Sequence, residues 1–307
     1  MELGDASALE RELNSGRFVV TAELAPPVAS DPAAFIARAA TLKGVATAVN
    51  VTDGAGAKAH LSSIAAAYFL LASGVEPVLQ MTCRDRNRIA LQSDLIGALA
   101  LGIRNVLVLT GDDPKLGDQP ETKPVFDLDS RGLLEMANRV RREHKLPPGT
   151  EIKGPAHLLL GAADLPIDPP SGWTPKSLIA KVEAGADFVQ TQFCMDVAVV
   201  RRYAARLVEL GIAPRLKVLI GVAPVPSARS ARWMREKLFG TIIPDAMVDR
   251  LEKAADARRE GIRICAELMQ QFAEIPGIAG AHVMAPQNPS SIPAAIAESG
   301  VVGRPRA

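Results

Sequence analysis

Two adjacent carboxylates follow directly on a run of apolar residues. Residues 106–109 read Val-Leu-Val-Leu, and Thr-Gly-Asp-Asp-Pro comes next, with the acids at Asp112 and Asp113. Gly111 permits a sharp turn, and Pro114 cannot continue a strand. Because parallel α/β proteins bind ligands at the carboxyl ends of their strands, the pair is a candidate for ligand chemistry. The alternative is an ordinary solvated turn.

Glu23 is a second candidate, because it interrupts the apolar segment Val-Thr-Ala-Glu-Leu-Ala-Pro-Pro at residues 20–27. A carboxyl group that is withdrawn from water holds its proton more tightly. Such a group can donate a proton near neutral pH, as a general acid must. The alternative is a glutamate on a solvated strand edge.

Gln190 and Gln192 end another strand-like segment, at residues 188–193. Strand alternation places the two amides on the same face. An amide both donates and accepts hydrogen bonds, so the pair suits a heterocycle with both kinds of edge group. The alternative is that they fill a polar layer inside the fold.

A glycine pattern and an arginine cluster are weaker signals. Gly54-x-Gly56-x-x-Ala59, with Glu76 about 20 residues on, imitates a dinucleotide-binding fingerprint, but a turn between strand and helix is the favoured interpretation. Three arginines could receive a phosphate group, or form a solvated loop that Asp85 partly neutralises. They are Arg84, Arg86 and Arg88.

No metal site or disulfide framework is indicated. The chain has four histidines without metal-ligand spacing and three widely separated cysteines. His157 and His282 lie within or beside strands, and we expect them in the core. The other residues of these types are His60, His144, Cys83, Cys194 and Cys265.

These candidates need a scaffold, and the chain alternates strand-like and helix-like segments with near-uniform spacing. Eight strands in 307 residues predict an α/β fold, a (β/α)8 TIM barrel forming a single domain over residues 1–307. We also expect an extra N-terminal helix within residues 1–16 and one long helix over residues 244–272, before the last strand. The expected strands are 18–24, 46–52, 77–83, 105–110, 156–163, 188–193, 216–222 and 280–284.

Polar residues recur where each of these strands ends. Because those ends meet at one mouth of a barrel, their convergence is the functional signal. The mouth positions are Glu23, Thr52, Asp53, residues 80–85, Asp112, Asp113, Asp164, residues 190–192, residues 224–227, Gln287 and Asn288.

Composition narrows the class of protein. A net charge of +1 lacks the footprint of a nucleic-acid binder, and no apolar run reaches the roughly 20 residues that span a bilayer. The acidic N-terminus argues against a signal peptide, so we expect a cytoplasmic protein. The apolar composition is compatible with pairing through helix faces, so we expect a homo-oligomer.

The order of the motifs resembles that of the methylenetetrahydrofolate reductase family, which are FAD-containing (β/α)8 barrels. The resemblance runs from about Arg17 to the C-terminus. It rests on Glu23 before Pro26-Pro27, Val51-Thr52-Asp53-Gly54-Ala55, Gln80-Met81-Thr82-Cys83, Gly111-Asp112-Asp113-Pro114, Lys181-Val182-Glu183-Ala184-Gly185-Ala186, Thr191-Gln192-Phe193 and residues 280–286.

The resemblance implies a role for each matching residue. Glu23 would be the general acid that protonates the N10 nitrogen of the folate. Asp112 would hydrogen-bond the pterin and influence the flavin, Gln192 would bind the pterin edge, and Met234 would contact the folate. FAD would be lined by Thr52, Gln80, Thr110, Gly111, Asp112, Ala163 and Lys181.

The implied reaction passes hydride from NAD(P)H through the flavin to methylenetetrahydrofolate, giving 5-methyltetrahydrofolate, or runs in reverse. Two alternatives stay open: a barrel that binds folate or flavin as a subunit of a larger complex, and a reductase that uses NADH without flavin. The chain departs from the family pattern at Gln80, Ser177, Ala180, Ser230, Met234 and Asn288.

Overall fold

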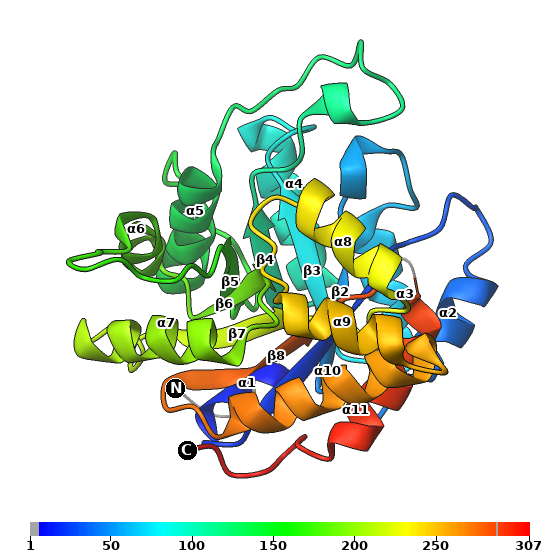
Figure 1. The fold of residues 1–307 in the computed structure, drawn as a ribbon. Helices are drawn as coiled ribbons and strands as arrows, with labels where there is room; N and C mark the ends of the chain where they lie inside the picture. The colour runs from blue at the N-terminus through cyan, green and yellow to red at the C-terminus, as the bar shows by residue number, and fades with distance from the viewer. Residues whose placement is uncertain (1–5, 287) are drawn as a thin grey trace.

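Eight parallel strands form a closed barrel in the computed structural model, which describes residues 6–286 and 288–307 (Figure 1). Each strand pairs with its sequence neighbours, and the last strand pairs with the first. The predicted (β/α)8 fold is therefore confirmed. The strands are β1 Val19–Leu24, β2 Ala48–Val51, β3 Pro77–Thr82, β4 Asn105–Leu109, β5 Leu159–Asp164, β6 Phe188–Phe193, β7 Lys217–Val222 and β8 Ile278–Val283.

Helices surround the barrel, and polar caps set many of their ends. Asn87 and Asp196 accept hydrogen bonds from the first-turn amides of α4 and α7, and Gly185 ends α6 with a φ of 110°. The helices are α1 Ala8–Asn14, α2 Ala33–Ala40, α3 Ser63–Ala72, α4 Arg88–Ala100, α5 Ser130–Glu143, α6 Lys176–Ala184, α7 Val197–Glu209, α8 Ala228–Lys237, α9 Asp245–Lys253, α10 Ala257–Ala273 and α11 Ile292–Ser299.

The single long helix expected over residues 244–272 is wrong. The segment forms two helices, α9 and α10, because Ala254 and Asp256 have extended backbone conformations between them. The Asp256 carboxylate caps the second helix by accepting from the amide of Arg259 at 3.0 Å. A short acidic side chain favours such a cap over continuation of the helix.

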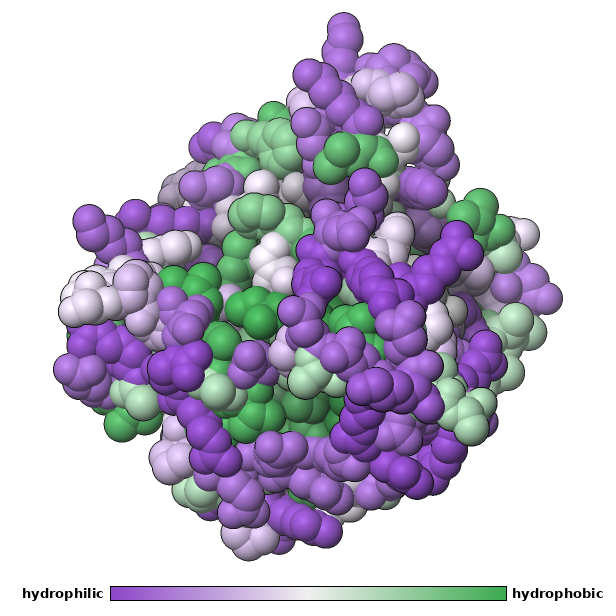
Figure 2. All heavy atoms as spheres, viewed as in Figure 1, coloured by the Kyte–Doolittle hydropathy of each residue, from purple (hydrophilic) through white to green (hydrophobic). Residues whose placement is uncertain are grey.

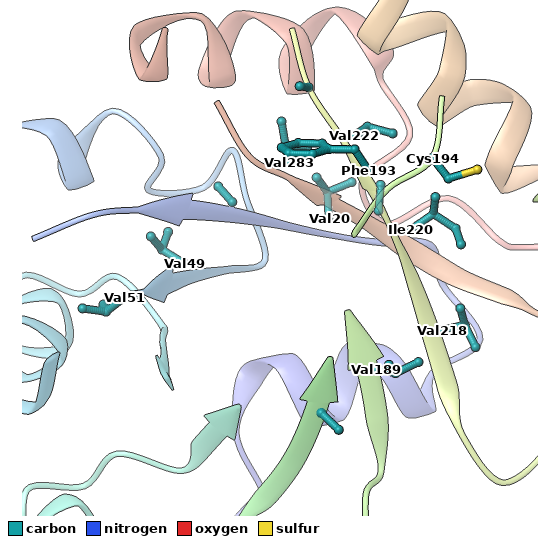
Figure 3. Packing of buried hydrophobic residues seen from close by; sticks show 14 of the residues in the cluster. Val20, Val49, Val51, Val189, Phe193, Cys194, Val218, Ile220, Val222 and Val283 are labelled. Carbon is teal, nitrogen blue, oxygen red and sulfur yellow. The ribbon is translucent and has the colours of Figure 1, made fainter. Parts of the chain in front are cut away.

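Side-chain alternation gives the barrel an outer core. Val20, Ala22 and Leu24 of β1 face outward and are buried in the main hydrophobic cluster with the surrounding helices. Figure 3 shows the corresponding residues of neighbouring strands, among them Val222 and Val283, gathered in the same layer. Burial of each such side chain contributes about 1.5–3 kcal/mol. The outer core therefore holds the helices on the barrel.

The inside of the barrel is apolar at its amino-terminal end, where α1 closes it. Leu9 and Leu13 of α1 are 0% and 1% exposed and pack with inward residues of the strands, including Phe188. The Ser7 hydroxyl donates to Asn105 Oδ1 at 2.6 Å and fixes the start of the helix. The expected extra helix is therefore a plug, and the part of the prediction that falls on residues 1–5 lies outside the described residues.

One glycine makes room inside this layer. A Cβ atom on Gly161 would lie 2.3 Å from the ring of Phe188. Any side chain at position 161 of β5 would therefore clash with the ring of Phe188.

The surface mixes both polarities. On the face shown in Figure 2, apolar residues are exposed near the centre and hydrophilic residues surround them. Among residues 6–286 and 288–307, no helix is both long enough and apolar enough to span a bilayer.

Candidate active site at the mouth of the barrel

Glu23 lies on the inward face of β1, near its carboxyl end. Its side chain is 26% exposed, and Oε2 accepts a hydrogen bond from Gln80 Nε2 at 3.0 Å. His282 Nε2, on β8, is 3.6 Å from the same oxygen. The alternative of a solvated strand edge is wrong, because the closed barrel has no edge.

A buried polar layer lies beside Glu23 and contains Gln190. His282 Nδ1 is 2.9 Å from Thr21 Oγ1, which accepts from Gln190 Nε2 at 2.9 Å. Gln190 also exchanges two hydrogen bonds with Asn50, at 2.6 and 2.9 Å. All four of these side chains are buried. For Gln190, the alternative that it fills a polar layer of the barrel is therefore the one that the structure supports.

Gln192 lies two residues further along β6 and is more exposed than Gln190. Its Nε2 donates to the carbonyl oxygen of Phe239 at 3.2 Å, and its Oε1 accepts from the amide of Phe193 at 3.0 Å. The side chain can reach a ligand edge only by exchanging these protein partners. The two glutamines therefore have different environments, although alternation places them on one face.

Asp112 follows β4 in an exposed loop. Its Oδ2 accepts from the amide of Gly56 at 2.9 Å, which ties the loop after β4 to the loop after β2. Gly111 has a φ of +99°, and a Cβ there would lie 2.9 Å from Cβ of Arg84. This turn therefore requires glycine, and it presents Asp112 to solvent at the mouth.

Thr52, Gln80 and Thr110 lie at or just beyond the carboxyl ends of β2, β3 and β4. Thr52 is 5% exposed, and its Oγ1 has no hydrogen-bond partner among the described residues. A buried hydroxyl without a partner is costly, so a ligand group that approaches it would be stabilised. Thr110 is exposed in the same part of the mouth.

Ala163 and Lys181 lie in a separate groove between β5 and α6. Lys181 Nζ donates to the carbonyl oxygen of Ala163 at 2.6 Å and lies 3.8 Å from Asp164 Oδ1. These three residues and Ser177 help to line a cavity of about 440 Å³.

Asp164 is a largely buried carboxyl group of this groove. Burial raises its pKa, against the lowering effects of a hydrogen bond from Tyr203 and the charge of Lys181. The Tyr203 hydroxyl donates to Asp164 Oδ2 at 2.5 Å. Tyr203 itself is fully buried, so Asp164 is anchored to the core below the groove.

Met234, on α8, is 3% exposed and packs in the main hydrophobic core. Ser230, on the same helix, shares a 3.1 Å hydrogen bond with Ser227. Asn288 is also buried and donates to the hydroxyl of Ser291, whereas Gln287 lies outside the described residues.

Each arginine of the cluster has its own carboxylate partner. Arg84 is 4% exposed and donates to both oxygens of Asp85, at 2.7 and 2.8 Å. Arg86 pairs with Asp53 and with Asp94, and Arg88 binds Asp127 through two guanidinium nitrogens. The solvated-loop interpretation is wrong for Arg84, because the side chain is buried. The pairs leave Nη1 of Arg84 and Nε of Arg86 buried without a hydrogen-bond partner among the described residues.

Asp53, which the sequence placed at the mouth, has hydrogen-bond partners that the sequence did not show. Its carboxylate accepts from the amide and hydroxyl of Thr82, at 2.8 and 2.9 Å, from Ser63 at 3.1 Å and from Arg86. It therefore joins the ends of β2 and β3 to α3. Its position directly after Thr52, at the end of a strand, was the available signal.

The glycines of the fingerprint-like segment form a loop. Gly54 and Gly56 have φ values of 60° and 64° around a short 3-10 turn, Ala55–Ala57. A doubly wound sheet is excluded because the barrel is closed. The interpretation of these glycines as a turn between strand and helix is confirmed.

His282 lies in the core as expected, whereas the expected core position of His157 is wrong. His282 is 2% exposed, and the three cysteines are free and buried. His157 is only half-buried and contacts Glu10 of α1 at 2.5 Å. Within the described ranges, no three His, Cys, Asp or Glu side chains are grouped closely enough to hold a metal ion.

Comparison with known proteins gives a consistent result. A family model described as methylenetetrahydrofolate reductase matches residues 8–300. The probable methylenetetrahydrofolate reductase (NADPH) of Caenorhabditis elegans is 29% identical over 199 residues, which are 64% of this chain and 27% of that protein. Methylenetetrahydrofolate reductase 2 of Saccharomyces cerevisiae is 24% identical over 243 residues, 75% of this chain and 37% of that protein. The chain thus matches about a third of the length of these relatives.

A solved structure shares the fold. An uncharacterized protein from Clostridium thermocellum, described as binding two copies of 5-methyl-5,6,7,8-tetrahydrofolic acid, superposes with a TM-score of 0.63. The match covers 95% of this chain and 97% of that one, at 13% sequence identity. At this identity the likeness concerns the barrel alone.

Proposed function

Because the chain belongs to the methylenetetrahydrofolate reductase family, we propose that it reduces 5,10-methylenetetrahydrofolate to 5-methyltetrahydrofolate with NAD(P)H as the electron donor. The observation that carries the proposal is the environment of Glu23. A partly exposed carboxyl group is held at the carboxyl end of a barrel strand by Gln80 and His282. Active sites of this fold lie at that end.

Glu23 is the proton donor in this proposal. The methylene carbon of the substrate bridges N5 and N10, and protonation of N10 lets the bond between N10 and that carbon break. The electron pair of the bond stays on N10, and an iminium forms at N5, ready to accept hydride. Because Oε2 of Glu23 already accepts from Gln80, the proton to be donated belongs on Oε1.

Asp112 and Gln192 orient the substrate. Asp112 is exposed at the mouth and can accept from the donors of the pterin edge. Gln192 would exchange its bond to the Phe239 carbonyl for one to the same ring. Both groups fix the direction in which the reacting carbon faces, and such placement accounts for much of a rate enhancement.

Two features of the structure support the proposal that the protein binds FAD. The buried hydroxyl of Thr52 has no hydrogen-bond partner among the described residues. Lys181 lines the groove between β5 and α6. The residues that would hold FAD are Thr52, Gln80, Thr110, Gly111, Asp112, Ala163 and Lys181. The flavin, when bound, supplies hydride transfer between NAD(P)H and the one-carbon unit. The protein supplies position, the proton and the electrostatic environment.

One observation favours a second candidate, a reductase that takes hydride from NADH without flavin. The amide of Gln80, which the family resemblance assigns to the flavin, is bonded to Glu23 instead. The broader alternative is a folate- or flavin-binding subunit of a larger complex. The homo-oligomeric state and the cytoplasmic location stay predictions.

The test is product formation by the purified protein. It is mixed with methylenetetrahydrofolate and either NADH or NADPH, with and without added FAD, and 5-methyltetrahydrofolate is identified by mass spectrometry. Product that depends on FAD supports the main proposal, and product formed equally without FAD supports the second candidate. If folate binds but no donor gives product, the reductase proposal is wrong and the subunit alternative stands.

A further inference from the structure

The imidazole of His282 is enclosed inside the barrel next to the proposed acid. The residue is 2% exposed, and its two ring nitrogens meet two different strand residues. Nδ1 is 2.9 Å from Thr21 Oγ1, and Nε2 is 3.6 Å from Glu23 Oε2. Which nitrogen carries the proton therefore decides whether the ring donates toward Glu23 or toward Thr21.

The buried amides beyond Thr21, with their oxygen and nitrogen atoms as assigned in this structure, give the hydrogen bonds one direction. Gln190 Nε2 has two hydrogens, and it donates one to Asn50 Oδ1 at 2.9 Å and one to Thr21 Oγ1 at 2.9 Å. Its Oε1 accepts from Asn50 Nδ2 at 2.6 Å. Thr21 is thus an acceptor from Gln190, and its own single hydrogen is left for His282 Nδ1.

An imidazole that accepts at Nδ1 carries its proton on Nε2. That N–H then faces Oε2 of Glu23, the oxygen that also accepts from Gln80 at 3.0 Å. Because Gln80 donates to Oε2 and the His282 N–H lies 3.6 Å from the same oxygen, a proton on the Glu23 carboxyl group is best placed on Oε1.

We propose that His282 is a positioning residue for Glu23, held by Thr21 and Gln190 in the tautomer that carries its proton on Nε2. With Gln80, it orients the carboxyl group so that the proton to be transferred lies on the oxygen without protein donors. The catalytic part of this inference rests on the proposed role of Glu23 as the acid, whereas the tautomer does not.

The tautomer is measured directly on protein labelled with 15N in its histidines. The sequence has only four histidines, so the His282→Gln variant identifies the signals of His282. The side-chain 15N shifts distinguish a protonated Nε2 from a protonated Nδ1. We expect a ring that carries a proton on Nε2 and accepts at Nδ1, and a ring that loses this preference in Thr21→Val, which keeps the branched shape but removes the hydroxyl.

Thr191→Val is the matched control, because Thr191 is also a buried strand threonine but bonds Gly221 and the carbonyl of Gln192 instead. It should leave the signals of His282 unchanged. A proton on Nδ1 in the unmutated protein, or an unchanged tautomer in Thr21→Val, would overturn the inference. These spectra need no turnover, so their outcome is independent of whether the proposed reaction occurs.

The catalytic part is tested by the rate of folate reduction. The contact between His282 Nε2 and Glu23 Oε2 is 3.6 Å long and therefore weaker than a full hydrogen bond, so His282→Leu should lower kcat by about tenfold with little change in KM. His282→Gln places an amide N–H near the position of Nε2 and should recover most of the loss. Equal rates in His282→Leu and the unmutated enzyme would contradict the positioning role.

Discussion

Gln80 on β3 donates a 3.0 Å hydrogen bond to Glu23 on β1, across the strand that separates them. Both side chains face the inside of the barrel, so residues 57 positions apart in the chain meet at its mouth. The contact binds one carboxylate oxygen and leaves the other for a substrate. The family resemblance led us to expect that Gln80 contacts the flavin. In the structure it is hydrogen-bonded to Glu23, the proposed acid.

Replacing Glu23 by Gln should separate the two halves of the proposed reaction. General acid catalysis contributes about 10²- to 10⁴-fold, so Glu23→Gln should lose folate reduction by that factor. Oxidation of NAD(P)H by bound flavin needs no such proton and should persist. Stopped-flow absorbance measures both steps, and Asp113→Asn, a change of a loop-capping acid, is the control. Full folate turnover in Glu23→Gln would show that the acid is another group.

Replacing Lys181 by Ala should weaken flavin binding. Lys181 lines the groove between β5 and α6, and its ammonium group is held in place by a hydrogen bond to the carbonyl oxygen of Ala163. A flavin bound in this groove would contact that positive charge. We expect the Kd for FAD to rise about tenfold, the effect of one hydrogen bond to a charged group. Titration with FAD, followed by fluorescence quenching, measures it. Lys176→Ala changes an exposed lysine of the same groove, and equal loss in both variants would sink the assignment.

Asp164 should make stability depend on pH. Burial raises its pKa above the ordinary value of 3.8, so the folded state binds a proton more tightly than the unfolded state does. Its contribution to stability therefore grows as the pH falls from neutral toward the unfolded pKa, and shrinks as the pH rises. Asp164→Asn removes this dependence and keeps an acceptor for Tyr203.

Urea unfolding at pH 7 and at pH 5 measures this effect. The urea concentration at the midpoint of unfolding should be higher for Asp164→Asn than for the unmutated protein, and this gain should be larger at pH 7 than at pH 5. Equal differences at the two pH values would mean that Asp164 titrates alike in both states.

The plug formed by α1 should matter for stability and not for chemistry. Leu9 is fully buried among inward residues of the barrel, and truncation of such a leucine costs about 2–5 kcal/mol. We expect Leu9→Ala to lower the free energy of unfolding by that amount and to leave kcat unchanged at a temperature where it is folded. Leu116→Ala, at a leucine that is 77% exposed, is the control, and equal stability of both variants would refute the plug.

The fold was readable from the sequence because its signals are local. Apolar strands such as residues 106–109 alternate with capped helices, and the alternation alone predicts a barrel. The break between α9 and α10 was missed because the charged pattern of residues 244–272 is helical on both sides of it. Only the extended conformations of Ala254 and Asp256 reveal the interruption.

The partners within the site could not be read in the same way. Thr21 and His282 are 261 residues apart, and they become neighbours only when the barrel closes between β1 and β8. Likewise, alternation put Gln190 and Gln192 on one face, but depth along the barrel decides that one is buried in a polar layer and the other is at the mouth. Strand order and depth are properties of the assembled barrel.

The most direct test of the account is anaerobic addition of 5-methyltetrahydrofolate to the purified protein loaded with FAD, followed by its visible spectrum. The account predicts that the flavin band bleaches, because the reverse of the proposed reaction passes hydride from the methyl group to the flavin. It also predicts that Glu23→Gln slows this bleaching. A flavin band that persists in the unmutated protein, although folate is bound, would contradict the proposed reductase.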